Sequence, residues 1–141
     1  MSILASLPIT PGVQTLEQAQ RWLQQQACLH HWPEPIYFAF QLSVDEALNN
    51  ILQHGFLAPP LPTDSIKLVL HSTQPQQFMI ELIDNAPPFD PSRMEASALA
   101  TDVDSAHIGG HGIRLMRHYL HDIQYAYLQG HNHLYLYARC P

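Results

Sequence analysis

The sequence has few basic residues and no long apolar run, and both absences narrow its function. Six Lys and Arg residues stand against twelve Asp and Glu residues, which gives a net charge of −6 at neutral pH. Nucleic acids and anionic membrane surfaces are bound by basic faces, so neither is an expected partner. No apolar stretch approaches the roughly 18 residues of a membrane span, and the N-terminus lacks the basic and long apolar regions of a signal peptide.

Cysteine is also scarce, because the chain has two, Cys28 and Cys140, far apart in the sequence. We expect reduced thiols in a cytoplasmic protein. Charged residues make up 13% of the chain and hydrophobic residues 46%, which excludes a charge-rich disordered protein. The length of 141 residues predicts a single domain over 1–141, with no internal repeat.

Histidine, in contrast, is abundant, with ten residues in the chain. Several occur in close pairs: His30 with His31, His118 with His121, and His131 with His133. Zinc sites need three or four converging ligands, whereas these pairs lie on different expected elements and no cysteine cluster accompanies them. We expect them to tune charge near pH 6–7, and a His-rich metal-binding protein stays as an alternative.

Prolines and apolar periodicity divide the first half of the chain into a strand and two helices. The strand is expected over 2–9. The first helix is expected to begin with Thr15 as its N-cap, with Gln18 completing a capping box, and to end before Pro33. The second helix is expected to begin near Pro35 and to end at Gly55, with an apolar stripe that includes Phe38, Leu42, Leu48, Ile51 and Leu52.

The second half predicts two hairpins separated by a long connection and a helix. The strands are expected over 66–73, 78–84, 123–128 and 133–139, and the helix after the glycines at 109–110. Residues 85–108 form a long connection, which in a compact domain is usually functional. This order predicts an α+β fold, a two-layer sandwich in which a mostly antiparallel, mixed sheet carries helices on one face.

The first segment that suggests chemistry contains Glu46, Asn50 and His54. Residues four apart lie about 40° apart around a helix axis, so the three form one polar ridge. Such a ridge is either the solvated face of an amphipathic helix or a set of groups that point into a cleft. In a cleft, the Asn oxygen is a possible Mg²⁺ ligand and the Glu a possible proton acceptor.

Two further segments suggest a ligand site. Asp84 ends an apolar strand just before a turn, where its carboxylate either caps the turn or accepts a hydrogen bond from a ligand. Gly109, Gly110 and Gly112 precede an apolar helix, where the sequence suggests either a hinge or a set of backbone N–H groups that binds an anion.

Taken together, these segments resemble the histidine-kinase-like ATP-binding domain. SVDEALNNILQHG is similar to the N box of that family, IDNAPPFDP to its first glycine box, and GGHGIRLMRHYLHDIQY to its second. From residue 2 to residue 139 the chain resembles the small bacterial anti-sigma factor serine/threonine kinases. The resemblance implies ATP and Mg²⁺ as cofactors.

The resemblance also implies roles for individual residues. Glu46 would be the general base, Asn50 would hold Mg²⁺, and Asp84 would accept a hydrogen bond from the adenine amino group. The glycines at 109, 110 and 112 would wrap the phosphates, and residues 91–108 would form a lid. His54 would contact a phosphate, and Phe89 and Ile113 would line the adenine pocket.

Ala86 and His111 depart from the family pattern, because the family usually has Gly and Leu at these two places. The extra methyl group of Ala86 predicts either a narrower adenine pocket or a backbone without a positive φ.

The implied reaction is transfer of the ATP γ-phosphoryl group to a Ser or Thr of a STAS-domain anti-anti-sigma protein. The resemblance adds a sigma factor and a metal-dependent phosphatase as further partners, and it implies that the chain forms a homodimer. The alternative is a nucleotide- and partner-binding regulatory module without kinase activity.

Overall fold

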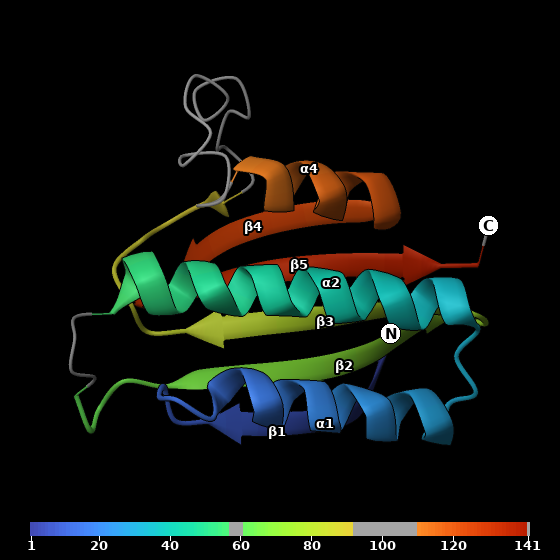
Figure 1. The fold of residues 1–141 in the computed structure, drawn as a ribbon, viewed down its shortest axis with the longest axis horizontal. Helices are drawn as coiled ribbons and strands as arrows, with labels where there is room; N and C mark the ends of the chain where they lie inside the picture. Colours follow the sequence, from blue (N-terminus) through green and yellow to red (C-terminus); the bar gives the residue numbers. More distant parts are fainter. Residues whose placement is uncertain (57–60, 92–109, 141) are drawn as a thin grey trace.

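The computed structural model describes residues 1–56, 61–91 and 110–140. Five strands form one sheet in the order β1-β2-β3-β5-β4, and every pair of neighbours is antiparallel (Figure 1). The strands are β1 (Ser2–Ile9), β2 (Ile66–Gln74), β3 (Gln77–Asp84), β4 (Asp122–Leu128) and β5 (His131–Arg139). The expected sheet is confirmed, but the described strands contain no parallel pair that would make it mixed.

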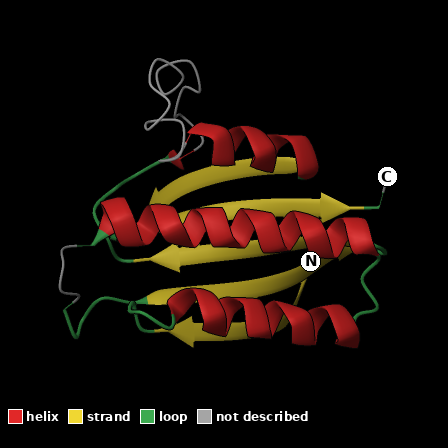
Figure 2. Ribbon diagram, in the orientation of Figure 1, coloured by secondary structure: helices red, strands yellow, loops and turns green. Residues whose placement is uncertain are grey.

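Three helices lie side by side on one face of this sheet (Figure 2). They are α1 (Thr15–Leu29), α2 (Glu34–Asn50) and α4 (Gly110–Tyr119). A wider π-helical turn, η1 (Ile51–Gly55), continues α2 to the glycine where the helix was expected to end. The α+β fold with helices on one face is therefore confirmed. No helix within the described ranges is long and apolar enough to cross a membrane.

The core lies between the two layers. Alternate strand residues point toward the helices, so Leu68, Ile80 and Leu136 are completely buried. Helix α2 and the turn after it bury Leu48 and Ile51 of the expected apolar stripe, but not Phe38. The inner residues of α2 include Phe40 and Val44, whereas Phe38 is 44% exposed. The expected stripe was therefore wrong for Phe38, and the rotation of α2 also decides which of its polar residues are buried.

The turns show one error and one success of the sequence analysis. Thr15 does not cap α1, because its hydroxyl oxygen accepts a hydrogen bond from the Gly12 backbone N–H (2.8 Å), in the turn before the helix. The predicted capping box is therefore wrong. The predicted hairpin between β2 and β3 is confirmed, with Gln76 at a φ of 62° in the turn.

Candidate functional site

A small cavity lies where the C-terminal end of α2 and η1 meets the ends of β3, β4 and β5. Its volume is about 20 Å³, which is room for a single water molecule. Its walls are formed by Ala47, Asn50, Ile51, Gly55, Asp84, Ala86, Pro87, Phe89, Pro91, Tyr125, Asn132 and Leu134. Four of the residues singled out in the sequence, Asn50, Asp84, Ala86 and Phe89, are thus brought together here from two separate segments.

Asn50 is the buried member of the polar ridge on α2. Its side chain is 2% exposed, and its amide Nδ2 has no hydrogen-bond partner among the described residues. A solvated helix face is therefore the wrong interpretation for this residue. An unpaired buried amide group costs about 1–3 kcal/mol, so a ligand that accepts a hydrogen bond from the Asn50 Nδ2 would gain affinity from this contact.

Glu46 and His54 lie on either side of Asn50, and neither belongs to the cavity wall. Glu46 is half-buried, and its pKa is raised, first by burial and then by the negative charge of the adjacent Asp45. His54 is exposed, and its ring stacks on Phe89 with a centroid distance of 5.8 Å and an interplanar angle of 30°. His54 therefore contacts a residue of the cavity wall, Phe89, but does not line the cavity itself.

Asp84 is the buried carboxylate of the cavity, at 5% exposure. Its Oδ1 accepts hydrogen bonds from the Ala86 backbone N–H (3.0 Å) and from Nδ2 of Asn132 (2.9 Å). Burial raises the pKa of Asp84, while these two hydrogen bonds act in the opposite direction. Asp84 therefore caps its turn, as one interpretation predicted, and it also lies in the cavity wall, whereas a hydrogen bond from a ligand stays a prediction.

Ala86 occupies the position where the family pattern has glycine. It is buried and lies in the cavity wall, and its φ is not positive. A Cβ added at Gly55 would lie 3.2 Å from the Ala86 Cβ, which is closer than ordinary van der Waals contact. The methyl group of Ala86 therefore fits because Gly55 has no side chain, and it occupies space at the edge of the cavity.

Asn132 and Tyr125 are cavity residues that the sequence analysis missed. The Asn132 Nδ2 donates to Asp84 and also to the carbonyl oxygens of Ala86 and Pro87, both at 3.1 Å. Its Oδ1 accepts from the Phe89 backbone N–H at 3.0 Å and from the Tyr125 hydroxyl. Asn132 could have been found as a polar residue that pairs with Asp84 across neighbouring strands. The strand predicted over 133–139 began one residue too late to include it.

The third sequence segment is described only in part. Gly110 begins α4 and Gly112 lies in its first turn, whereas Gly109 and the lid residues 92–108 lie outside the described residues. Pro91, the first residue of the predicted lid, belongs to the cavity wall. Ile113 is 2% exposed in the hydrophobic core and is not one of the wall residues.

The histidines do not gather into a metal centre in the part of the chain that the structure describes. There, no three His, Cys, Asp or Glu side chains are arranged to hold a metal ion.

Residues 9–137 match the family described as histidine kinase-like ATPase domain. The chain belongs to this family. The serine/threonine-protein kinase BtrW of Bordetella bronchiseptica is 37% identical over 131 residues, which are 93% of this chain and 90% of that protein. ATP binding and a serine/threonine kinase type of activity are therefore supported at the level of the family, and the resemblance found in the sequence is confirmed.

A solved structure agrees with this histidine kinase-like ATPase fold. The crystal structure of the RsbU and RsbW domains of Rv1364c from Mycobacterium tuberculosis superimposes with a TM-score of 0.63 at 12% identity. The match covers 96% of this chain and 32% of that chain. At this identity the likeness concerns the fold alone.

Proposed function

We propose that this chain is an ATP-dependent protein serine/threonine kinase whose substrate is a Ser or Thr of a STAS-domain anti-anti-sigma protein. The observation that carries the proposal is the cavity in which Asn50 and Asp84 are buried together in a histidine kinase-like ATPase fold. An unpaired amide and a buried carboxylate in one cavity favour a ligand that has both donors and acceptors.

Asp84 is the proposed acceptor for the adenine amino group, and Ala86 and Phe89 are proposed to lie against the ring. The phosphates are proposed to lie near the start of α4, because the family resemblance assigns phosphate contacts to the glycines at 109, 110 and 112, which have no Cβ. An anion is stabilised there by the partial positive charge of a helix N-terminus.

Asn50 is the proposed Mg²⁺ ligand through its Oδ1, because the side chain is buried in the wall of the cavity, while its unpaired Nδ2 is free to donate to an acceptor of the ligand. Amide oxygens are suitable ligands for this ion, which when bound neutralises phosphate charge. Glu46 is the proposed general base, one helical turn away. The hydroxyl oxygen of the substrate forms the new bond to the γ-phosphorus, its proton passes to the Glu46 carboxylate, and the bond to the β-phosphate oxygen breaks to release ADP.

The proposed partners follow from the family rather than from a contact in this chain. They are the STAS-domain protein, a sigma factor that this chain would sequester, and a metal-dependent phosphatase that would reverse the modification. A homodimer in the cytoplasm completes the proposal. The acidic net charge of −6 is compatible with protein partners and disfavours nucleic acid.

Ala86 favours a second candidate, a regulatory module that binds nucleotide and partner without catalysis. Its methyl group lies in the wall of a cavity of about 20 Å³, so the wall must move before adenine can enter. The two candidates differ in phosphoryl transfer, which only the kinase performs.

The test uses the variants Asn50→Ala and Glu46→Gln. Asn50→Ala should weaken Mg-ATP binding and transfer together, whereas Glu46→Gln should leave binding nearly intact and lower transfer by about 10²–10⁴-fold. Calorimetry gives the ATP dissociation constant, and radiolabelled ATP with a STAS-domain protein gives the transfer rate. The neighbouring Asn49→Ala and the exposed Glu17→Gln are matched controls.

Wild-type transfer by Glu46→Gln would show that this residue is not the base. ATP binding without transfer by the wild-type protein would favour the regulatory module. If saturating Mg-ATP fails to raise the Tm of nucleotide-free protein, both candidates fail, because ligand at 100 times Kd should add about 2.7 kcal/mol of stability.

A further inference from the structure

Asn132 forms hydrogen bonds with several parts of the cavity wall, although the proposed function gives it no role. Its side chain lies at the start of β5, in register with Asp84 at the end of β3, and is 4% exposed. The amide group donates to Asp84, Ala86 and Pro87 and accepts from Phe89 and Tyr125. One side chain therefore joins β3, β4, β5 and the turn that forms part of the cavity wall.

The hydrogen bonds of Asn132 distinguish the two oxygens of the Asp84 carboxylate. Oδ1 already accepts from Asn132 and from the Ala86 N–H, whereas no described residue donates to Oδ2. A carboxylate held by one oxygen has a defined orientation, and its second oxygen remains available for an external donor. Asp84 is therefore prepared to accept one hydrogen bond in the cavity.

We propose that Asn132 is the positioning residue for base recognition, which makes the preference for adenine over a 6-oxopurine depend on its amide. The inference rests on the proposed function, in which Asp84 accepts a hydrogen bond from the adenine amino group. Inosine triphosphate differs from ATP by an oxygen in place of that amino group. A carboxylate in the orientation set by Asn132 attracts the amino group of ATP and repels the carbonyl oxygen of ITP.

A pH profile separates positioning from mere structural support. Asp84 accepts from the amino group more strongly when it is ionised, and burial raises its pKa while the Asn132 amide opposes that rise. The other groups that act on Asp84 are His131 and His133 on β5, which act to lower its pKa, and Tyr125 on β4. Loss of the Asn132 donor should raise the pKa of Asp84 further, so ATP binding should weaken at a higher pH than in the wild type.

The decisive variant is Asn132→Leu, which has a similar size, removes the donor to Asp84 and introduces no second carboxylate that could share a proton with it. Its dissociation constants for ATP and ITP are measured by calorimetry from pH 5.5 to pH 8. The preference for ATP should fall roughly 10- to 100-fold, and the pH at which ATP binding weakens should rise. Asn85→Ala is the matched control, because Asn85 bonds Ser65 and Thr63 rather than Asp84.

Tyr125→Phe keeps the test decisive if Asn132→Leu does not fold. This variant removes one hydrogen bond to the Asn132 oxygen and should reduce the ATP preference by a smaller factor. An unchanged ratio of ATP to ITP affinity in the folded variants would overturn the inference. Failure of the wild-type protein to bind ATP would instead overturn the proposed function.

Discussion

At the scale of single residues, the methyl group of Ala86 limits the space of the cavity. It packs against Gly55, where a second Cβ would lie 3.2 Å away, and it forms part of a wall around about 20 Å³. Adenine cannot enter a space of this size unless the wall moves. The free energy of moving the wall is then subtracted from the affinity for ATP.

Ala86→Gly should therefore tighten ATP binding several-fold, because one methyl group no longer has to be displaced. The Tm of the nucleotide-free protein should fall slightly, since glycine loses more backbone entropy on folding, about 0.5–1 kcal/mol. Calorimetry gives the affinity and a thermal melt gives the stability. Ala138→Gly, also buried but in β5 outside this cavity, should lower the Tm without changing affinity. Weaker ATP binding by Ala86→Gly would contradict the prediction.

The sequence predicted several cavity residues but not all of their contacts. Asn50 was found because it lies at helical spacing from Glu46 and His54, and Asp84 because it ends an apolar strand just before a turn. The burial of Asn50 was not predictable, since it depends on how α2 is rotated by the packing of Phe40 and Val44. Asn132 was missed because its role comes from pairing with a residue 48 positions away.

At the scale of elements, helix α2 places two acidic side chains next to each other in a half-buried position. Burial raises the pKa of both Asp45 and Glu46, and the charge of Asp45 raises the pKa of Glu46 further. The folded protein thus binds these protons more tightly than the unfolded chain does. The free energy of unfolding should therefore decrease as the pH rises from the ordinary carboxyl range, about 4, through the raised pKa values.

Asp45→Asn should lower the pKa of Glu46, because the nearby negative charge is removed. A general base works only when ionised, so the acid limb of the transfer rate should move to lower pH. Rates of phosphoryl transfer from pH 4.5 to pH 8 measure this shift. Asp64→Asn, in the exposed turn before β2, should leave the profile unchanged. A profile that stays fixed in Asp45→Asn would mean that another group titrates.

The positions at which the helices begin and end were predicted better than the hydrogen bonds and the helix type found there. Prolines and Gly55 marked where the helices begin and end, because these residues restrict the backbone locally. The hydroxyl of Thr15 instead bonds the turn at Gly12, a choice that depends on how the chain enters the helix. The π-helical turn after Asn50 gave no sequence signal that distinguishes it from an ordinary last turn.

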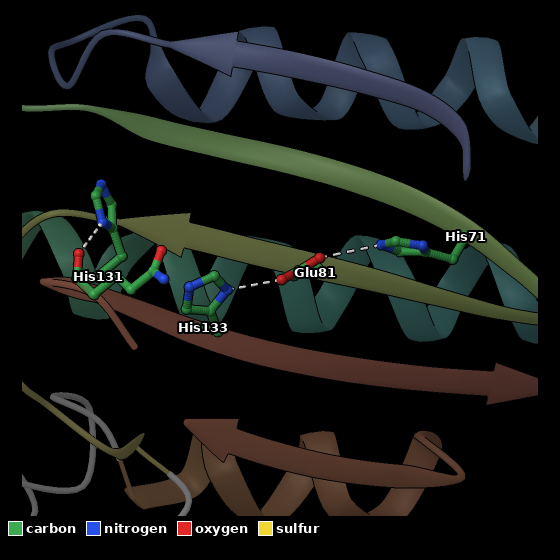
Figure 3. A network of polar contacts seen from close by, with 5 residues as sticks. His71, Glu81, His131 and His133 are labelled. Carbon is green, nitrogen blue, oxygen red and sulfur yellow. Dashed lines mark hydrogen bonds and ion pairs between the residues drawn. The ribbon is translucent and has the colours of Figure 1, made fainter. Parts of the chain in front are cut away.

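At the scale of the whole molecule, the two faces of the sheet carry different features. The helices and the cavity occupy one face, and a polar network lies on the other (Figure 3). There Glu81 on β3 bonds Nε2 of His71 on β2 (3.1 Å) and Nδ1 of His133 on β5 (2.7 Å). His131, nearby on β5, places its Nδ1 3.0 Å from the Gln129 carbonyl oxygen.

The layered architecture was predictable because apolar alternation and helical periodicity are local properties of the sequence. The network around Glu81 was not, since its members come from three strands and meet only through the register of the sheet. Two of the ten histidines thus bond a carboxylate between strands, a use that composition alone does not reveal.

Glu81→Ala should therefore reduce stability with little change in nucleotide affinity. The variant leaves two largely buried imidazoles without their shared acceptor, and hydrogen bonds to a charged group of this kind contribute about 1.5–3 kcal/mol each at most. Chemical denaturation should show a loss of about 1–3 kcal/mol, because water can reach the partly exposed rings. The dissociation constant for ATP should change little, since the cavity lies on the opposite face and burial, rather than His133, has the largest effect on the pKa of Asp84. Glu17→Ala, which breaks the exposed pair with Arg21, should cost less than about 0.5 kcal/mol. If Glu81→Ala weakens ATP binding while the protein stays folded, the two faces of the sheet are coupled and their independence is wrong.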